Sequence, residues 1–319
     1  MQKLVLGARA STILYNFLLA NKVEIGQGKF LLPANVCPIV PVTFLKAGVN
    51  FEFIDISPID FCIDKSLLIS RIKEDSKIKG VLFVRTFGFF ENLQDLFSEI
   101  KHLKNNIFLI DDRCPCIPSF NQVDVYDESD ITLYSTGYAK FVELNSGGFG
   151  FINEEANYKP QFENFKSEDH TALVEKMNES ISSNQSFDYE NSNWLLFEHD
   201  LDLDNYKATV LKKVKEVKRH KSLINEIYSG LLPKEIQFPN DFHNWRFNIK
   251  VKNKQKVLAC IFEQQLFASS HYASIAHLFS PQSAPVAEQV HDNTINLFND
   301  FRFSEDMAKR LCHIVNQNI

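Results

Sequence analysis

The first half of this chain alternates short apolar runs with amphipathic stretches, and this alternation most narrows what the chain can fold into. The apolar runs include GVLFVR at 80–85 and IFLID at 107–111, which are typical of strands buried inside a sheet. Between such runs lie segments whose apolar residues recur at helical spacing. Strands and helices that follow one another in turn predict an α/β domain built around a mostly parallel sheet.

The same patterns predict where individual elements begin and end. We expect helices at 11–21, 38–47, 64–74 and 93–104, and strands at 29–32, 51–54, 80–85 and 107–111. Residues 154–202 turn polar and lose the strand signals, so we place a domain junction there and divide the chain into 1–175 and 176–319. Beyond the junction we expect a long helix with a solvated basic face at 206–228, a strand at 244–251, further structure at 254–263 and a terminal helix at 304–315.

Composition excludes several classes of protein. The chain has 319 residues, 45% of them hydrophobic, which is enough to bury a large core. Its net charge of −6 comes without any basic block, so no nucleic-acid partner is expected. No apolar run reaches the roughly 18–20 residues of a membrane helix and no leader follows Met1, so we expect a cytoplasmic protein. The cysteines lack paired CxxC spacing, so we expect free thiols and no metal site.

One lysine stands out for its surroundings. Lys140 lies in the run ITLYSTGYAKFVELNSGGFGF at 131–151, whose apolar flanks predict that its amine is buried beside small and hydroxylic residues. Burial favours the neutral form of lysine, and a neutral amine can form a Schiff base with an aldehyde. Pyridoxal phosphate is the obvious biological aldehyde. The alternative interpretation is a surface lysine on a loop.

The spacing around Lys140 resembles the cofactor-lysine segment of the DegT/DnrJ/StrS family of sugar aminotransferases. Ser135 lies five residues before the lysine and the pair Gly147-Gly148 begins seven residues after it. Three further stretches follow the family's order, so the resemblance covers about 8–153 and returns near the C-terminus. It implies a fold type I pyridoxal-phosphate transferase, with a large domain around a mixed, mostly parallel sheet and a smaller α+β C-terminal domain.

The resemblance also implies a set of cofactor contacts. Asp112, at the end of IFLIDD, would keep the cofactor's ring nitrogen protonated, although DDRCP also fits a turn in which this aspartate is a capping residue. Ser135 and the small-residue turn at 8–12 would hold the phosphate at the start of a helix, with either Gly7-Ala8 or Ser11-Thr12 in the family's Gly-Thr position. Besides the catalytic Lys140, the implied cofactor contacts are Asp112, Ser135, Arg9, Ala10, Ser11, Cys37 and Tyr138.

Two of these residues have a second interpretation, and three more are implied substrate contacts. Arg9 is either a cationic contact or a surface arginine. Cys37 occupies the position of the aromatic residue that stacks on the cofactor ring, and it could equally be a core thiol. Arg85 stands where the family has the histidine of a His-x-x-Gly turn, and the pair His271-Tyr272 is similar to a family pair in the small domain. A packed structural histidine is the alternative for His271.

The family also has features that this chain lacks. Its members carry about thirty residues ahead of the phosphate turn and an Asn-Tyr-Arg motif that reaches into the neighbouring subunit, and neither is evident here. The resemblance implies a homodimeric aminotransferase that acts on a keto sugar, expected to be nucleotide-linked, with an amino-acid donor such as glutamate. The missing motif keeps open a non-catalytic or regulatory relative that retains the fold. An unrelated α/β binding protein is a third possibility.

Overall fold

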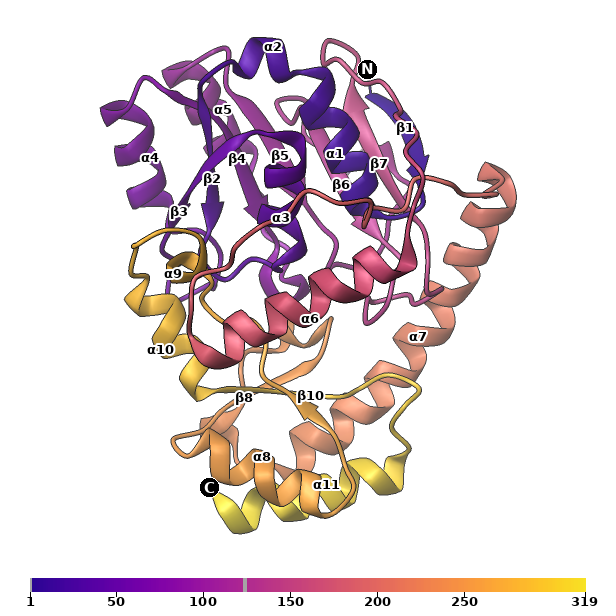
Figure 1. The fold of residues 1–319 in the computed structure, drawn as a ribbon. Helices are drawn as coiled ribbons and strands as arrows, with labels where there is room; N and C mark the ends of the chain where they lie inside the picture. Colours follow the sequence, from indigo (N-terminus) through magenta and orange to yellow (C-terminus); the bar gives the residue numbers. More distant parts are fainter. Residues whose placement is uncertain (1, 123–124) are drawn as a thin grey trace.

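The computed structural model describes residues 2–122 and 125–319 (Figure 1). A large seven-stranded sheet with helices on both sides forms one part, and a small three-stranded sheet with its own helices forms the other. The long helix α7 (Leu203–Leu231) runs from one part to the other. Tyr206 and Val210, near its start, pack on the large sheet, whereas Ile224 and Tyr228 pack in the core of the small part.

The large sheet is mixed and mostly parallel. It consists of β1 (Gln2–Gly7), β2 (Lys29–Pro33), β3 (Asn50–Ile54), β4 (Ile78–Val84), β5 (Phe108–Asp112), β6 (Ile131–Ser135) and β7 (Gly148–Asn153). The strand order is β1-β7-β6-β5-β4-β2-β3. Only β7 runs antiparallel to its neighbours, and every other pair is parallel. The α/β fold class predicted from the alternation is confirmed.

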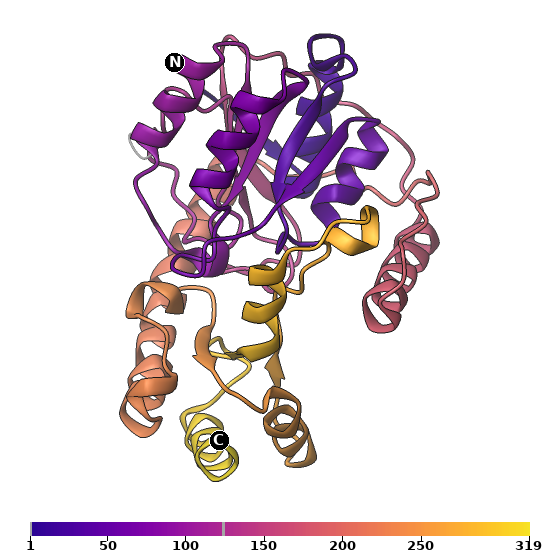
Figure 2. The same ribbon diagram turned by 90° about the vertical axis from the view of Figure 1, so that its left-hand side faces the viewer.

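Two layers of helices cover the sheet, and strand alternation decides which residues face each layer (Figure 2). Leu82 and Val84 of β4 share a core with one pair of helices, and Val81 and Phe83 share a core with the other pair. The first pair is α1 (Ala10–Ala20) and α3 (Ile39–Ala47), with the short α2 (Lys22–Ile25) between them, and the second pair is α4 (Lys65–Glu74) and α5 (Gln94–Leu103).

All eight elements predicted in the first half are confirmed to within two residues at each end. Local signals explain this agreement: Asp64 Oδ1, for example, accepts hydrogen bonds of 2.9 Å from the N–H groups of Ser66 and Leu67 and so caps the start of α4. Among the elements before α7, the patterns missed β1, α2, β6, β7 and α6 (Ser167–Ser183). The predicted boundary at residue 175 lies within α6, and the division of the chain there stays a prediction.

The smaller part is built on an antiparallel sheet in the order β8-β10-β9. Its elements are β8 (Phe247–Lys250), α8 (Lys254–Glu263), β9 (Ala268–Ser269), β10 (Thr294–Leu297) and α11 (Glu305–Asn318). Between β9 and β10 the chain forms α9 (Ala276–Phe279) and α10 (Pro285–Asn293), whose buried residues pack in the core of the large sheet. The predicted long helix, the strand within 244–251 and the terminal helix are all present. Among the described residues, no helix has the length and apolar character needed to cross a membrane.

A buried histidine in this part predicts acid sensitivity. His243 is 4% exposed, stacks on Phe247 with ring centroids 3.8 Å apart, and accepts a hydrogen bond of 3.1 Å from the N–H of Asn248 at Nδ1. Burial lowers the pKa of His243 to about 4, whereas a histidine in the unfolded chain titrates near 6.5. The unfolded state therefore takes up its proton first, and stability that is present above pH 6.5 is lost as the pH falls toward 4.

We expect this histidine to account for a loss of roughly 3 kcal/mol in the free energy of unfolding across that range. Urea denaturation at pH 7 and pH 4.5 measures the loss. A His243→Asn variant, whose Oδ1 can replace Nδ1 as acceptor, should lose clearly less stability on acidification. An equal loss in both proteins would contradict the prediction.

Candidate functional site

A cavity of about 390 Å³ lies where β2, β5 and β6 end, at the carboxyl edge of the large sheet. We call it the lysine cavity. Apolar side chains of Leu14, Val40 and Leu133 form part of its wall. The residues that the sequence predicted as catalytic or cofactor contacts all line it: Lys140, Asp112, Ser135, Arg9, Ala10, Ser11, Cys37 and Tyr138. The fold thus brings together segments that lie far apart in the sequence.

Lys140 lies on the connection from β6 to β7, residues 136–147, which we call the lysine loop. The loop closes on itself through a 2.8 Å hydrogen bond from the N–H of Leu144 to the carbonyl of Thr136. Phe141 and Val142 anchor it, since both are buried in the core beneath. The apolar residues that follow the lysine therefore fix its position, as the sequence predicted, while Lys140 itself is half-buried.

The residue before the lysine has an unusual backbone. Ala139 has a φ of 57°, in the left-handed region that non-glycine residues rarely adopt. Both of its polar backbone groups are held: the N–H donates to Glu143 Oε2 at 2.9 Å, and the carbonyl accepts from Trp245 Nε1 at 2.6 Å. Trp245 belongs to the small part of the molecule, so that part is hydrogen-bonded directly to the lysine loop.

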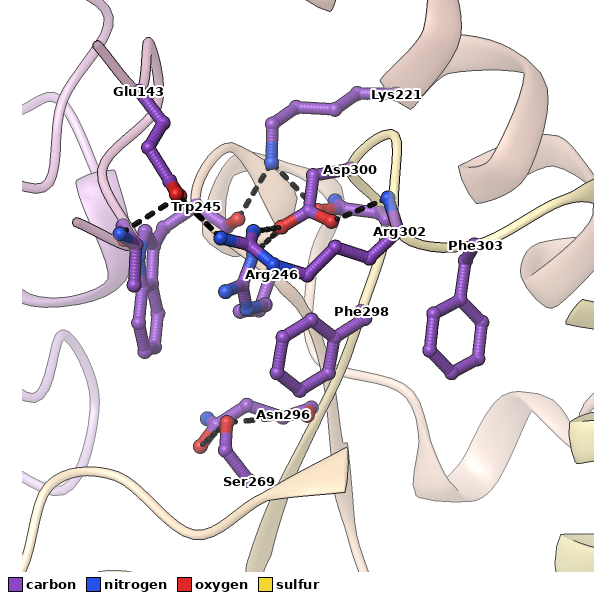
Figure 3. A network of polar contacts seen from close by, with 12 residues as sticks. Glu143, Lys221, Trp245, Arg246, Ser269, Asn296, Phe298, Asp300, Arg302 and Phe303 are labelled. Carbon is purple, nitrogen blue, oxygen red and sulfur yellow. Dashed lines mark hydrogen bonds and ion pairs between the residues drawn. The ribbon is translucent and has the colours of Figure 1, made fainter. Parts of the chain in front are cut away.

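An ion-pair network reinforces this connection (Figure 3). Arg302 donates to both carboxylate oxygens of Glu143, at 2.5 and 2.6 Å, and to Asp300 at 2.9 Å. Arg246 also pairs with Asp300, at 2.5 Å. The Arg302 guanidinium lies 5.3 Å from the ring centre of Tyr138, which is 73% exposed at the rim of the lysine cavity. No local sequence signal marks Glu143 and Arg302, because their partnership spans the two parts of the chain.

Lys140 is charged in this environment, contrary to what the sequence predicted. Burial alone would lower the pKa of Lys140, but the acidic groups around it, beginning with Tyr272 and including Cys114 and Asp112, raise it above its ordinary value. The prediction that burial makes this amine neutral is therefore wrong for the folded site. A reaction at Lys140 must include removal of its proton.

Asp112 combines the two roles that its sequence context left open. Its Oδ1 accepts a 2.9 Å hydrogen bond from the N–H of Cys114, as in a turn, and its side chain also lines the lysine cavity. The residue is 6% exposed, and burial raises the pKa of Asp112, against the effects of its contact with Cys114 and of the Lys140 charge. A positively charged group in the cavity would favour the ionised carboxylate.

The other end of the cavity is suited to an anion. Helix α1 starts after Arg9 with no side-chain hydrogen bond at its N-cap and no acidic residue in its first turn, so its N–H groups can face an anion. Ser11 and Ser135 line the cavity beside this helix start. The hydroxyl of Thr12 instead donates to the carbonyl of Leu196 at 2.6 Å. Of the two alternatives for the small-residue turn, the one that includes Ser11 reaches the cavity, because Gly7 lies at the end of β1.

Helix α6 covers this end of the cavity and was missed by the sequence patterns. His170 and Val174 of α6 line the cavity, and His170 Nε2 lies 3.3 Å from Arg9 Nη1. Burial, together with the charge of Arg9, lowers the pKa of His170. The segment is polar and buries few apolar side chains, among them Leu173 and Met177, so its pattern looked like a linker.

Gly148 is the residue whose substitution should most directly disturb the helix start. A Cβ atom added there would lie 2.5 Å from the N atom of Ala10 and 2.9 Å from the carbonyl carbon of Arg9, and backbone atoms cannot rotate away. We expect Gly148→Ala to displace this turn and to cost about 1–3 kcal/mol of stability. If the turn holds the phosphate that the resemblance implies, pyridoxal-phosphate binding should weaken about ten-fold or more. Fluorescence titration with the cofactor and urea denaturation measure both effects.

Gly230→Ala is the matched control for that change. A Cβ atom added at Gly230, in α7, would meet no other atom within 4 Å, so cofactor affinity should not change. Equal affinity of the Gly148→Ala protein and the natural protein would show that the helix start tolerates the added methyl group.

The structure corrects the expected role of Arg85. Its side chain is fully buried and lies away from the residues that line the lysine cavity. It forms a bidentate ion pair with Asp111, with distances of 2.9 and 3.1 Å, and also donates to the carbonyl of Glu91. The Arg85 side chain is therefore bonded within the core, so it is not the substrate contact that the sequence predicted. Gly88, with a φ of 78°, does provide the expected sharp turn after β4.

The other two implied substrate contacts lie on the small part, above the lysine cavity. The ring of Tyr272 stacks on Trp245 with centroids 5.5 Å apart, and Tyr272 is the acidic group that acts most strongly on the charge of Lys140. His271 is exposed, and its N–H donates to Asn296 Oδ1 at 2.6 Å. Tyr272 is thus beside the reactive amine, and the role of His271 in substrate binding stays a prediction.

Comparison with known proteins shows the same fold in solved aminotransferases. A DegT DnrJ EryC1 StrS aminotransferase from Brucella abortus has a TM-score of 0.68 at 17% identity, over 98% of this chain and 85% of that one. PseC of Helicobacter pylori, an aminotransferase involved in the biosynthesis of pseudoaminic acid, has a TM-score of 0.71 at 15% identity, over 99% and 86%. The sugar aminotransferase CalS13 from Micromonospora echinospora has a TM-score of 0.67 at 14% identity, over 99% and 87%.

At these identities the comparisons show the fold. No protein-family model matches the sequence, and no curated protein matches it. The chain has the fold of the sugar aminotransferases that its motifs resemble, over nearly its whole length.

Proposed function

We propose that this chain, which has the aminotransferase fold, is a pyridoxal-phosphate-dependent enzyme that transfers an amino group to a keto sugar. The sugar would be carried on a nucleotide, and an amino acid such as glutamate would be the donor. The observation that carries the proposal is the composition of the lysine cavity. An amine at Lys140, a buried carboxylate at Asp112 and the uncapped start of α1 surround one space of about 390 Å³.

The residues fit pyridoxal phosphate group by group. The start of α1, with the hydroxyls of Ser11 and Ser135, would hold the phosphate. Asp112 would hold the proton on the ring nitrogen, and apolar side chains such as Leu133 would flank the ring. When bound, the cofactor supplies an aldehyde that reacts with amines and a ring that accepts electrons.

Lys140 would have two tasks that its surroundings explain. It must lose a proton before it can bond to the cofactor. Burial raises the pKa of Tyr272, so this phenol keeps its own proton and can interact with the amine without accepting a proton from it. As an amine inside the cavity it would then move a proton between the substrate carbon and the cofactor. The buried flanks Phe141 and Val142 restrict where the amine can reach.

Support for a sugar as the acceptor comes from the solved structures. CalS13 is described as a sugar aminotransferase, and PseC acts in the biosynthesis of pseudoaminic acid. We extend this substrate class to the present chain, together with a homodimeric assembly in the cytoplasm. Size-exclusion chromatography with light scattering tests the assembly, and a mass of one chain would contradict it.

Spectroscopy tests the function. Purified protein incubated with pyridoxal phosphate should be yellow, and borohydride followed by peptide mass mapping should find the cofactor on Lys140. Addition of L-glutamate should shift the absorption band, and nucleotide-linked keto sugars should reverse the shift when one of them is the acceptor. Colour without any donor-dependent shift would indicate a non-catalytic relative. A colourless preparation at every cofactor concentration would indicate an unrelated binding protein.

A further inference from the structure

Lys221 is a buried lysine of α7 that the proposed reaction does not use (Figure 3). Only 4% of the residue is exposed. Its Nζ donates hydrogen bonds to the carbonyl of Trp245 at 2.7 Å and to Oδ1 of Asn299 at 2.6 Å. Lysine is almost never buried unless it is paired, and here both acceptors are neutral oxygens. A buried ammonium group with these partners is an unusual use of a lysine.

The contacts of Lys221 join three segments of the chain. Trp245 leads into β8, and Asn299 follows β10. The third segment is the lysine loop, because the ring centre of Phe141 lies 5.3 Å from Lys221 Nζ, a distance at which a cation and an aromatic ring attract one another. Phe141 directly follows Lys140, so Lys221 contacts the loop next to the reactive amine.

Lys221 also acts on the other neighbour of Lys140, through Trp245. The indole Nε1 of Trp245 donates to the carbonyl of Ala139 at 2.6 Å. The main chain of Trp245 is held on both sides, since its N–H donates to the carbonyl of Phe87 at 3.3 Å and its carbonyl accepts from Lys221. The residues before and after Lys140 are therefore both linked to one ammonium group.

Asn299 fixes the position of that ammonium group. Its side-chain nitrogen donates to Oδ1 of Asn225 at 2.9 Å and to the carbonyl of His243 at 3.1 Å. Asn299 is fully buried, so its oxygen cannot turn away from Lys221 without breaking these bonds. Lys221 is thus a fixed point against which the lysine loop is held.

The charges around Lys221 affect the strength of this hold. Burial and the positive charges of Arg246 and Arg302 lower the pKa of Lys221 to about 7. Asp300 acts in the opposite direction, and Glu143 of the lysine loop pairs with Arg302. A neutral amine still has two N–H groups for its two acceptors, but hydrogen bonds from a charged donor are roughly twice as strong. The hold on the loop should therefore weaken as the pH rises through about 7.

We propose that Lys221 is a positioning residue for Lys140, which acts through Trp245 and Phe141 to fix the lysine loop at the lysine cavity. Lys221 itself lies outside the lining of that cavity. The inference rests on the proposed function, because the position of the amine matters to a reaction only if Lys140 reacts.

Indole NMR spectroscopy tests the contact without the cofactor. The chain has two tryptophans, so ¹⁵N labelling gives two indole signals, which a Trp194→Phe variant assigns. In Lys221→Met protein, hydrogen exchange of the Trp245 indole should become about ten-fold faster or more, which corresponds to the loss of one hydrogen bond to a charged group. The indole of Trp194, which donates to the Tyr189 hydroxyl at 3.3 Å, should exchange as before.

The natural protein provides a second readout. The chemical shift of the Trp245 indole should titrate with a midpoint near pH 7, and this titration should be absent from Lys221→Met protein. The neighbouring His220 is retained in that variant, so a titration caused by His220 would persist.

The rate at which Lys140 bonds to added pyridoxal phosphate tests the consequence for the amine. Absorbance should show bonding about ten-fold slower in Lys221→Met protein and in Trp245→Phe protein, which lacks only the indole N–H contact and keeps an aromatic ring. The double variant should be no slower than either single variant, because both residues act through one contact.

Lys254→Met is the matched control. Lys254 is also 4% exposed, and it donates to Ser270 Oγ at 2.8 Å and to the carbonyl of His291, neither of which belongs to the lysine loop. This variant should leave indole exchange and bond formation unchanged, and urea denaturation checks that both methionine variants fold. If Lys221→Met protein does not fold, the titration of the natural protein and Trp245→Phe carry the test.

Unchanged indole exchange in Lys221→Met protein would overturn the proposal, and so would equal effects of Lys254→Met. Bond formation at the natural rate in Lys221→Met protein would overturn it and leave the proposed function intact. Faster indole exchange, in a protein whose natural form never bonds pyridoxal phosphate at Lys140, would support the contact and remove the proposed function.

Discussion

Lys140→Met protein is expected to lose aminotransferase turnover by on the order of 10⁴-fold and to form no covalent bond with pyridoxal phosphate. Methionine keeps much of the length of the side chain but has no amine. Cofactor affinity should fall less than turnover, because the start of α1, Ser135 and Asp112 remain to hold the phosphate and ring. Borohydride trapping with mass mapping measures the bond, and single-turnover absorbance measures the transfer.

The stability of the Lys140→Met protein shows whether a loss of turnover comes from the missing amine or from misfolding. The surroundings raise the pKa of Lys140, so the folded state favours its charge, and removing the charge should lower the urea midpoint modestly while the protein still folds. Lys252→Met, at an exposed position, is the matched lysine control and should retain full turnover. Cofactor found by mass mapping on another lysine in Lys140→Met protein would sink the assignment.

Replacing Asp111 by asparagine should produce the largest loss of stability, about 3–5 kcal/mol in the free energy of unfolding. Asp111 is fully buried between two guanidinium groups, with Arg85 Nε at 2.9 Å from Oδ1 and Arg113 Nε at 2.7 Å from Oδ2. Burial alone would raise the pKa of Asp111, but the two arginines lower it below its ordinary value. Asparagine would remove the buried carboxylate that Arg85 and Arg113 share. Urea denaturation at pH 7 measures the loss, and a change under 1 kcal/mol would contradict this account.

The neighbouring aspartate provides the matched comparison. In Asp112→Asn the amide oxygen can still accept from the N–H of Cys114, so the turn should persist and stability should change by less than about 1 kcal/mol. Turnover should fall about a hundred-fold or more, because an amide cannot hold the ring proton of the cofactor. If Asp112→Asn were fully active, its turn-capping role would be its only one.

Strand alternation explains why these adjacent residues differ. Asp112 has the parity of Ile110, which faces α1 and α3, whereas Asp111 has the parity of Leu109, which faces α4 and α5. Arg85 likewise follows Phe83, on the face away from the lysine cavity. The motif correctly located Arg85 at the carboxyl edge of the sheet. The face toward which its side chain points follows only from its odd-numbered position, which it shares with Phe83.

Local patterns predicted the first-half elements, because strand ends and helix starts follow from short-range signals. The family resemblance, and not these patterns, supplied the residues expected around Lys140. The local patterns could not give α6, whose interior position depends on a few apolar residues such as Leu173 and Met177. Nor could they give the contact between Trp245 and Ala139, which joins residues 106 positions apart. Its existence depends on how two separately folded cores pack.

Because of this contact, the position of the Lys140 amine depends on how the small part of the molecule packs against the large part. Trp245 precedes β8 of the small sheet, and Lys140 lies between β6 and β7 of the large sheet. Ala139, which accepts the hydrogen bond from Trp245, has a backbone conformation that alanine seldom adopts. A hinge motion that withdrew the indole would let this peptide relax and would swing the lysine with it.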